Sequence, residues 1–215
     1  MARVLPRRFY GRASTVVAPE LLNKVLELGP CRGRIVEVEA YAGPLDPASH
    51  AYRGPTARNG VMFGPAGHLY VYFSYGVHYC ANAVTGPPGE GQAVLLRALE
   101  PLAGLEEMWA RRLRARRAVD LGSGPGKLTQ ALGIGPAHNG ADLVRGPIRI
   151  LDDGTPPPAQ PGVSVRIGIS QAADRPWRWF VAGNPNVSRA PRASGPPSRG
   201  SRTSPAASPR HPATR

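Results

Sequence analysis

Two glutamates stand two residues apart in the stretch IVEVEAY, at positions 37 and 39. On a strand, Glu37 and Glu39 point to the same face, where two like carboxylates lie about 7 Å apart. Such a pair is unfavourable in a dry core unless something pairs or uses it. Spacing alone leaves two interpretations open. One is a solvent-facing strand edge. The other is a site in which Glu39, at the strand's end, takes a proton from water as a general base.

The segment that follows, YAGPLDPASHAYRGPTARN, interleaves aromatic and basic residues. Tyr41 and His50 stand on it together with arginines such as Arg58. A lone loop histidine more often has a structural role, and no second histidine stands at metal-ligand spacing, so we expect no metal. Aromatic rings beside arginines suit stacking on bases while phosphates are gripped.

The stretch LYVYFSYGVHYCAN holds four of the chain's seven tyrosines. Strand alternation directs Tyr72 towards a cleft, and we interpret Phe73 as a core residue. Tyr75 precedes Gly76 at an expected hairpin turn, where its ring would protrude and could enter a base stack as a wedge. Asn82, on the return strand, offers an amide able to read a base edge.

Positioning these side chains requires a sheet. Hydrophobic periodicity and the turn residues predict a mixed α/β (α+β) single domain with a largely antiparallel sheet, flanking helices and a β-hairpin. We expect helices over 15–29 and 102–117, and a glycine-rich turn with a short helix within 123–134. Strands are expected over 33–43, 68–76, 77–84, 91–101, 146–151, 163–170 and 177–183.

The charge distribution suggests a polyanionic partner. Residues 187–215 contain six arginines and no acid, so the net charge of +13 for all 215 residues leaves +7 for residues 1–186. Nucleic acid is the commonest partner of so basic a body, and a solvated basic surface is the alternative. Residues 187–215 have too little apolar surface to offset their ordering entropy, so we expect a disordered tail after a folded domain at 1–186.

Cysteine use and hydropathy point to a cytoplasmic protein. Cys31 and Cys80 form no CxxC motif, which argues against structural zinc, and two cysteines make no disulfide framework. No apolar run follows the basic N-terminus, and none approaches the ~18 residues of a membrane span, so we expect neither a signal peptide nor a membrane partner.

Six stretches, taken in order, resemble the alkyladenine (3-methyladenine) DNA glycosylase family: GRIVEVEAY, SHAYRGPTARN, HLYVYFSYGVHYCAN, AVLLRALEPLAGLEEM, GPGKLTQALGI and RIGIS. The resemblance covers residues 5 to about 188. It implies a single domain around a curved antiparallel sheet with a protruding hairpin. It also implies a monomer, near the bacterial nucleoid, that excises alkylated or deaminated purines from duplex DNA without metal or cofactor.

The resemblance also implies roles at individual positions. Glu39 matches the general base that activates water, and Arg97 matches an arginine near that water. The remaining matches are Tyr41, His50 and Tyr72 around the flipped base, Asn82 as the amide that discriminates against guanine, and Tyr75 as the residue that fills the gap in the duplex.

Two further side chains, Arg58 and Lys127, are expected to contact DNA. No amine is placed for Schiff-base chemistry, which favours a monofunctional enzyme that leaves an intact abasic strand. The competing hypotheses are a non-catalytic damaged-DNA-binding protein and an RNA-binding protein.

Overall fold

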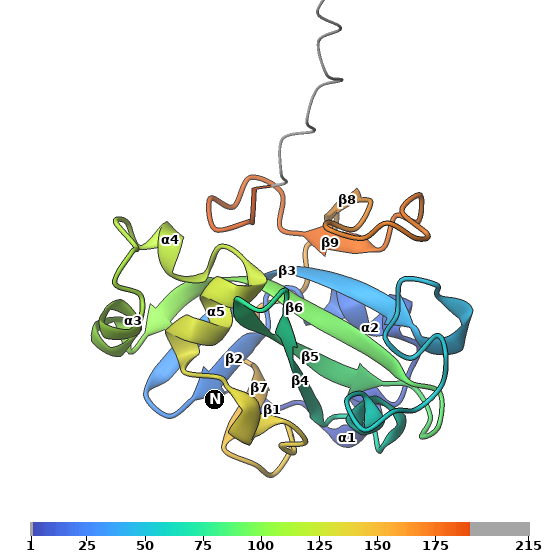
Figure 1. Ribbon diagram of the computed structural model, residues 1–215. Helices are drawn as coiled ribbons and strands as arrows, with labels where there is room; N and C mark the ends of the chain where they lie inside the picture. Colours follow the sequence, from blue (N-terminus) through green and yellow to red (C-terminus); the bar gives the residue numbers. More distant parts are fainter. Residues whose placement is uncertain (1, 190–215) are drawn as a thin grey trace, which may run out of the picture.

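Residues 2–189 of the chain are described by a computed structural model. They form one nine-stranded sheet in which every pairing is antiparallel. Strand order along its main path is β1-β7-β2-β3-β6-β5-β4, with β9 joined to β3 and β8 joined to β9. Figure 1 shows the sheet curving, with α3, α4 and α5 clustered at one end and α2 lying apart from them. The expected mixed fold with a curved antiparallel sheet is therefore confirmed.

The elements are short apart from two long central strands. The strands are β1 (Arg3–Val4), β2 (Val25–Leu28), β3 (Cys31–Ala42), β4 (Leu69–Ser74), β5 (His78–Thr85), β6 (Gln92–Ala103), β7 (Ile148–Asp152), β8 (Gly162–Ser164) and β9 (Arg178–Phe180). The helices are α1 (Arg7–Tyr10), α2 (Ser14–Leu21), α3 (Leu105–Arg111), α4 (Val119–Gly122) and α5 (Pro125–Leu132). Short 3₁₀ turns are η1 (Gly43–Leu45), η2 (Gly60–Phe63) and η3 (Pro136–His138).

The long strands β3 and β6 pair through two irregularities that matter for the site. Ile35 pairs with Leu99 and Glu37 with Ala98, so Val36 is an extra residue on β3. Val38 then pairs with Leu96, which leaves Arg97 as an extra residue on β6. Bulges of this kind re-aim side chains, and here they bring the arginine opposite the two glutamates.

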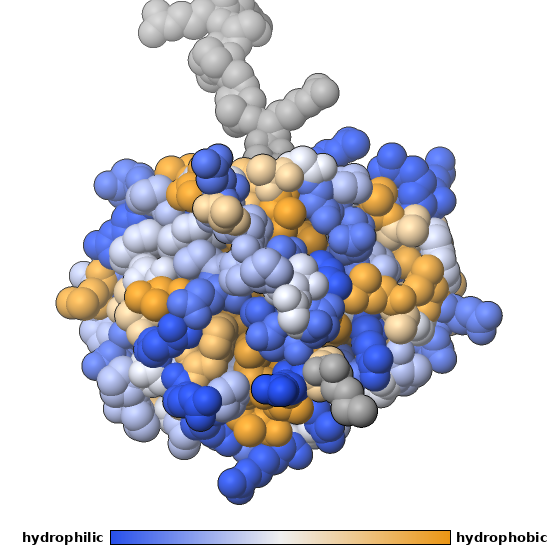
Figure 2. Space-filling model, turned by 180° about the vertical axis from the view of Figure 1, so that it is seen from behind, coloured by the Kyte–Doolittle hydropathy of each residue, from blue (hydrophilic) through white to orange (hydrophobic). Residues whose placement is uncertain are grey.

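The apolar side chains divide into a large core and a smaller one. The large core lies between the sheet and the helices, and it includes fully buried residues such as Leu21, Leu26 and Leu96. The smaller core contains Tyr70 and Met62, with Tyr72 packed against it. Figure 2 shows that on the face opposite that of Figure 1 hydrophobic residues are interleaved with hydrophilic ones. The smaller core therefore holds the rings of Tyr70 and Tyr72 in place.

Four sequence-based expectations about elements are wrong in part. The helix expected over 15–29 ends at Leu21, because Asn23 has a φ of 66° and Val25–Leu28 pairs with both β3 and β7. The helix expected over 102–117 covers only Leu105–Arg111. The strand expected over 163–170 is replaced by the shorter Gly162–Ser164, and the one expected over 177–183 covers only Arg178–Phe180. A short apolar run such as VLEL satisfies helix and strand periodicity equally, so neighbouring strands decide its conformation.

The folded body extends past the boundary expected at 186. Ser188 is buried, and it lies within the described residues. Apart from 187–189, the tail expected to be disordered lies outside the described residues.

Candidate active site

The two glutamates of β3 are fully buried around one arginine. Glu37 and Glu39 each have 0% exposure, so the alternative of a solvent-facing strand edge is wrong. Arg97 Nε donates to Glu37 Oε1 at 2.8 Å, and Arg97 Nη1 lies 3.1 Å from Glu39 Oε1. The arginine therefore bridges the two carboxylates.

Glu37 is saturated with hydrogen-bond donors from distant parts of the chain. Besides Arg97, it accepts from Arg178 Nε at 2.7 Å, from the Ser188 amide at 2.6 Å and from Ser188 Oγ at 2.8 Å. Burial acts to raise the pKa of Glu37, but the two guanidinium groups and the Ser188 amide lower it below its ordinary value. Glu37 is therefore a fixed anion that holds Arg97 in place.

Glu39 is less fully compensated than Glu37. Its Oε1 accepts from the Ile167 amide at 2.8 Å, and its Oε2 accepts from the Tyr41 hydroxyl at 2.9 Å. Burial raises the pKa of Glu39, and the opposing effects of Arg97 and the two hydrogen bonds do not cancel that rise. A carboxylate with a raised pKa takes up a proton more readily than an ordinary glutamate, as a general base must.

A cavity of about 610 Å³ lies directly in front of this buried cluster. Tyr41, Arg97 and Ile167 separate Glu39 from it and form part of its wall. Seven of the residues expected to act at the site line this one cavity: Tyr41, His50, Arg58, Tyr72, Tyr75, Asn82 and Arg97. The structure thus brings together all of the expected site residues except Glu39, which is directly behind the wall, and Lys127.

Aromatic rings form one side of the cavity. The ring centroids of His50 and Tyr72 lie 4.5 Å apart in an edge-to-face arrangement, and those of Tyr70 and Tyr72 lie 5.4 Å apart. His50 Nδ1 lies 3.1 Å from the Tyr70 hydroxyl, and burial lowers the pKa of His50. A neutral imidazole with a fixed partner presents a stable ring surface to a ligand.

Asn82 lies at the buried end of the same cavity. Its amide nitrogen donates to the Tyr70 carbonyl at 3.1 Å, which fixes the orientation of the amide group. Only 4% of the residue is exposed. Because a buried amide makes few alternative contacts, this one is suited to discriminate between ligands by their hydrogen-bonding groups.

The hairpin of β4 and β5 carries an exposed ring at its turn. Tyr75 is 83% exposed with a φ of 50°, and its hydroxyl donates to the Gly168 carbonyl at 3.0 Å. The interpretation of Phe73 as a core residue is wrong, because 47% of it is exposed and its ring packs on Tyr79 at the surface. Arg58 donates to the Phe73 carbonyl at 2.8 Å and so braces the hairpin.

The segment 165–171 is part of the site that sequence reasoning missed. It leaves the sheet after β8 and passes over the cavity, where Ile167 and Gly168 line the wall. Arg166 anchors it through a bidentate ion pair with the buried carboxylate of Asp46, and its guanidinium lies 4.7 Å from the Tyr41 ring centroid. The only sequence signal was the RIGIS motif, which alternation assigned to a strand.

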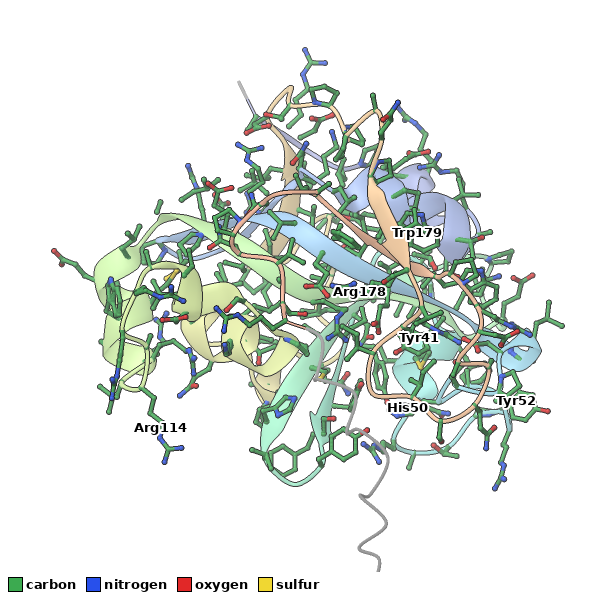
Figure 3. The ribbon with its side chains drawn as sticks, turned by 90° about the horizontal axis from the view of Figure 1, so that it is seen from above. Tyr41, His50, Tyr52, Arg114, Arg178 and Trp179 are labelled. Carbon is green, nitrogen blue, oxygen red and sulfur yellow. The ribbon has the colours of Figure 1, made fainter. Side chains whose placement is uncertain are left out.

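Two other partners were missed because they are distant in sequence. Arg178 and Ser188 contact Glu37 from positions 141 and 151 residues away. Figure 3 shows Arg178 near the middle of the molecule and Tyr52 farther out at its edge. Ser188 lies in a stretch whose composition resembles the tail, so nothing in the sequence marked it.

Within residues 2–189, no group of three or more His, Cys, Asp or Glu side chains is arranged to hold a metal ion. Among the same residues, no helix has the length and apolar character needed to cross a bilayer.

Comparison with known proteins gives a consistent result. A family model described as methylpurine-DNA glycosylase matches residues 8–185. A Burkholderia cenocepacia protein is 58% identical over 190 residues, covering 87% of this chain and 92% of that protein. A Methanoculleus marisnigri protein is 52% identical over 191 residues (86% and 98%), and one from Streptomyces avermitilis is 49% identical over 193 residues (86% and 90%). All three carry the name "Putative 3-methyladenine DNA glycosylase".

Proposed function

Because this chain belongs to the methylpurine-DNA glycosylase family, we propose that it excises damaged purines from duplex DNA by hydrolysis. The substrates are alkylated or deaminated purines of the 3-methyladenine and hypoxanthine type, and the product is an abasic site. The observation that carries the proposal is the buried Glu39–Arg97 pair behind an aromatic cavity, beside an exposed tyrosine at a hairpin turn.

Access to the base requires that the nucleotide leave the duplex. Extrusion costs a few kcal/mol, and least for damaged or mispaired bases. The Tyr75 ring enters the vacated stack, and the extruded purine enters the cavity between the aromatic residues Tyr41, His50 and Tyr72. Stacking contributes roughly 1–3 kcal/mol per base, and electron-poor alkylated purines stack well on tyrosine.

Cleavage is assigned to a water molecule and Glu39. The water oxygen forms a bond to the sugar carbon C1′, the electron pair of the broken N-glycosidic bond stays on the purine nitrogen, and a proton of the water passes to the Glu39 carboxylate. A cationic 3-methyladenine therefore leaves as the neutral base, and hypoxanthine leaves as an anion that takes up a proton from solvent. Positive charge builds on the sugar as the bond breaks, and the ionised carboxylate stabilises it. Arg97 orients Glu39 and the attacking water, and Glu37 holds Arg97 in position. Water reaches Glu39 in place of one of its present donors when a base occupies the cavity.

Asn82 is assigned the rejection of normal guanine. The 2-amino group of guanine would meet the fixed amide at the buried end of the cavity, whereas adenine and hypoxanthine carry only hydrogen at C2. A clash or an unpaired buried donor there disfavours the normal base.

A non-catalytic protein that only recognises damaged DNA is the alternative. Recognition needs the cavity, Tyr75 and the basic surface, but it does not need a buried carboxylate with a raised pKa. Four charged side chains form a network behind the cavity: Glu37, Glu39, Arg97 and Arg178. This network favours catalysis, because burying charges is costly and the network contributes little to recognition.

The test is a single-turnover assay on a duplex with one hypoxanthine opposite thymine, repeated on 3-methyladenine. Alkali reveals abasic sites, and borohydride tests for a trapped covalent complex. We expect alkali-dependent strand cleavage, release of the free base and no trapped complex. Binding of both duplexes without base release would support the non-catalytic alternative, and a borohydride-trapped complex would contradict a monofunctional mechanism.

A further inference from the structure

One buried ion pair, between Asp46 and Arg166, has no part in the proposed reaction. Both side chains are fully buried. Arg166 donates through Nη1 to Asp46 Oδ2 and through Nη2 to Asp46 Oδ1, the second contact at 2.9 Å. The two residues are 120 positions apart in the sequence. Because burying two charges is costly and apolar residues often stabilise a core as well, such a pair says more about positioning than about stability.

The pair holds the backbone of β3 on both sides of Tyr41. Arg166 Nη1 donates to the Ala40 carbonyl at 2.9 Å, and Asp46 Oδ2 accepts from the Ala42 amide at 3.3 Å. The Arg166 guanidinium also lies over the Tyr41 ring, 4.7 Å from its centroid. A planar guanidinium stacks on an aromatic face and binds a carboxylate through two bonds at once, which an ammonium cannot do. The position of the Tyr41 ring therefore depends on this arginine.

Both uncharged donors of Glu39 belong to the residues held in this way. The Tyr41 hydroxyl donates to Glu39 Oε2 at 2.9 Å. The amide of Ile167, the residue directly after Arg166, donates to Glu39 Oε1 at 2.8 Å. The buried pair is thus coupled to each oxygen of the carboxylate, once through an aromatic ring and once through the backbone.

These donors affect how readily Glu39 takes up a proton. Burial raises the pKa of Glu39, whereas Arg97, the Ile167 amide and the Tyr41 hydroxyl lower it. Misplacing the amide and the hydroxyl should therefore raise the pKa further. The charged or titratable side chains that face Glu39 from the surrounding elements are Glu37 and Tyr41 on β3, Tyr72 on β4, Cys80 on β5, Arg97 on β6 and Arg166, with Arg178 of β9 held on Glu37.

We propose that Asp46 and Arg166 are positioning residues for the reaction, because their ion pair holds the Ile167 amide and the Tyr41 hydroxyl on the two carboxylate oxygens of Glu39. The inference rests on the proposed function, in which Glu39 takes a proton from water. When water replaces one of the two donors, the other still orients the carboxylate. Without the pair, the carboxylate would be both misdirected and more easily protonated.

The test uses two variants that keep both charges but displace the pair, Arg166→Lys and Asp46→Glu. The matched controls Arg34→Lys and Asp153→Glu make the same changes in a bidentate pair that does not line the cavity. Carbon-13 NMR of the side-chain carboxyl groups follows the titration of Glu39, and Glu39→Gln assigns its signal. Single-turnover base release from a hypoxanthine duplex is measured over the same pH range, and urea unfolding confirms that each variant is folded.

In Arg166→Lys and Asp46→Glu, we expect the Glu39 titration to move to higher pH and the acid limb of base release to move with it. Base release at neutral pH should slow by about 10- to 100-fold, because a small misplacement of a catalytic group is costly, while DNA binding changes little. An ion pair that only stabilised the fold would lower the free energy of unfolding without moving the titration. An unmoved Glu39 titration in whichever variant folds, or an equal shift in the controls, would overturn the positioning role.

Failure of the proposed function would give a different result. If the unmodified protein bound the duplex without releasing the base, or if the acid limb did not follow the Glu39 titration, Glu39 would not be the general base. A titration shifted in Arg166→Lys but not in Arg34→Lys would still establish that the pair positions the donors of Glu39.

Discussion

At the scale of single residues, two glutamates on one strand differ in pKa because their donors differ. Glu37 has four donors, two of them from charged guanidinium groups, and its pKa is lowered. Glu39 shares one guanidinium and otherwise has neutral donors, and burial raises its pKa. Alternation in the sequence predicted their shared face, but it could not say which carboxylate the distant Arg178 would neutralise.

The raised pKa of Glu39 predicts the pH dependence of base release. A general base must be ionised, so the single-turnover rate should fall as pH decreases through the Glu39 pKa, which lies above the ~4.3 of an ordinary glutamate. Rates at saturating enzyme, with the dissociation constant measured at each pH, separate this effect from DNA binding. A rate that stays constant down to the ordinary glutamate pKa would contradict the assignment.

The lowered pKa of Glu37 predicts a contribution to stability. Because the folded pKa is depressed, this stabilisation is present above the unfolded pKa and is lost as pH falls through the folded value. At neutral pH, Glu37→Gln should lower the free energy of unfolding by about 3–5 kcal/mol, since buried guanidinium groups lose their counter-ion.

Urea unfolding provides the measurement for this variant. Glu27→Gln is the matched control, because it breaks a surface pair with Arg32 that contributes less than about 1 kcal/mol. Similar losses for the two variants would show that Glu37 is not the structural anion described above.

At the scale of elements, the hairpin β4–β5 forms one wall of the cavity. Its strands were predictable because alternating β-branched and aromatic residues flank a glycine turn. The exposure of Phe73 was not predictable, because an alternating pattern does not reveal that a strand such as β4 lies at the edge of the sheet. Segment 165–171 likewise has strand periodicity, yet Arg166 turns back to pair with Asp46. Its conformation is fixed by that tertiary contact.

The proposed function assigns Tyr75, exposed at the hairpin turn, as the side chain that enters the duplex. Tyr75→Ala should weaken binding to a hypoxanthine duplex by roughly 1–3 kcal/mol, and it should affect a single-stranded substrate less, where no stack needs filling. Tyr52→Ala, at a 45% exposed tyrosine that does not line the cavity, is the control. An equal loss on duplex and single strand would rule out a wedge role.

At the scale of the whole molecule, contacts between strand β3 and the last described residues complete the buried ion-pair network behind the cavity. Ser188 reaches Glu37 across 151 residues and also accepts from Arg97 at 3.4 Å. The sheet class and the cavity residues were foreseeable from local patterns and family motifs. The contact between Ser188 and Glu37 was not foreseeable, because polar contacts over such separations leave no periodicity in the sequence.

Removing the Ser188 hydroxyl should therefore affect global stability. Ser188→Ala should cost about 1.5–3 kcal/mol, the range for a hydrogen bond to a charged group, in the free energy of unfolding. Ser170→Ala, at an exposed loop position, should change it by less than about 0.5 kcal/mol. Thermal and urea unfolding that fail to distinguish the two variants would contradict a closing role for Ser188.

The most direct measurement is the single-turnover rate of Glu39→Gln on a hypoxanthine duplex, beside the unmodified protein and Glu27→Gln. The amide keeps the size of the side chain but cannot accept the proton of the water. We predict that DNA binding is retained and that base release slows by about 10²–10⁴-fold. Base release within a few-fold of the unmodified protein, by a folded variant that binds DNA, would contradict Glu39 as the general base.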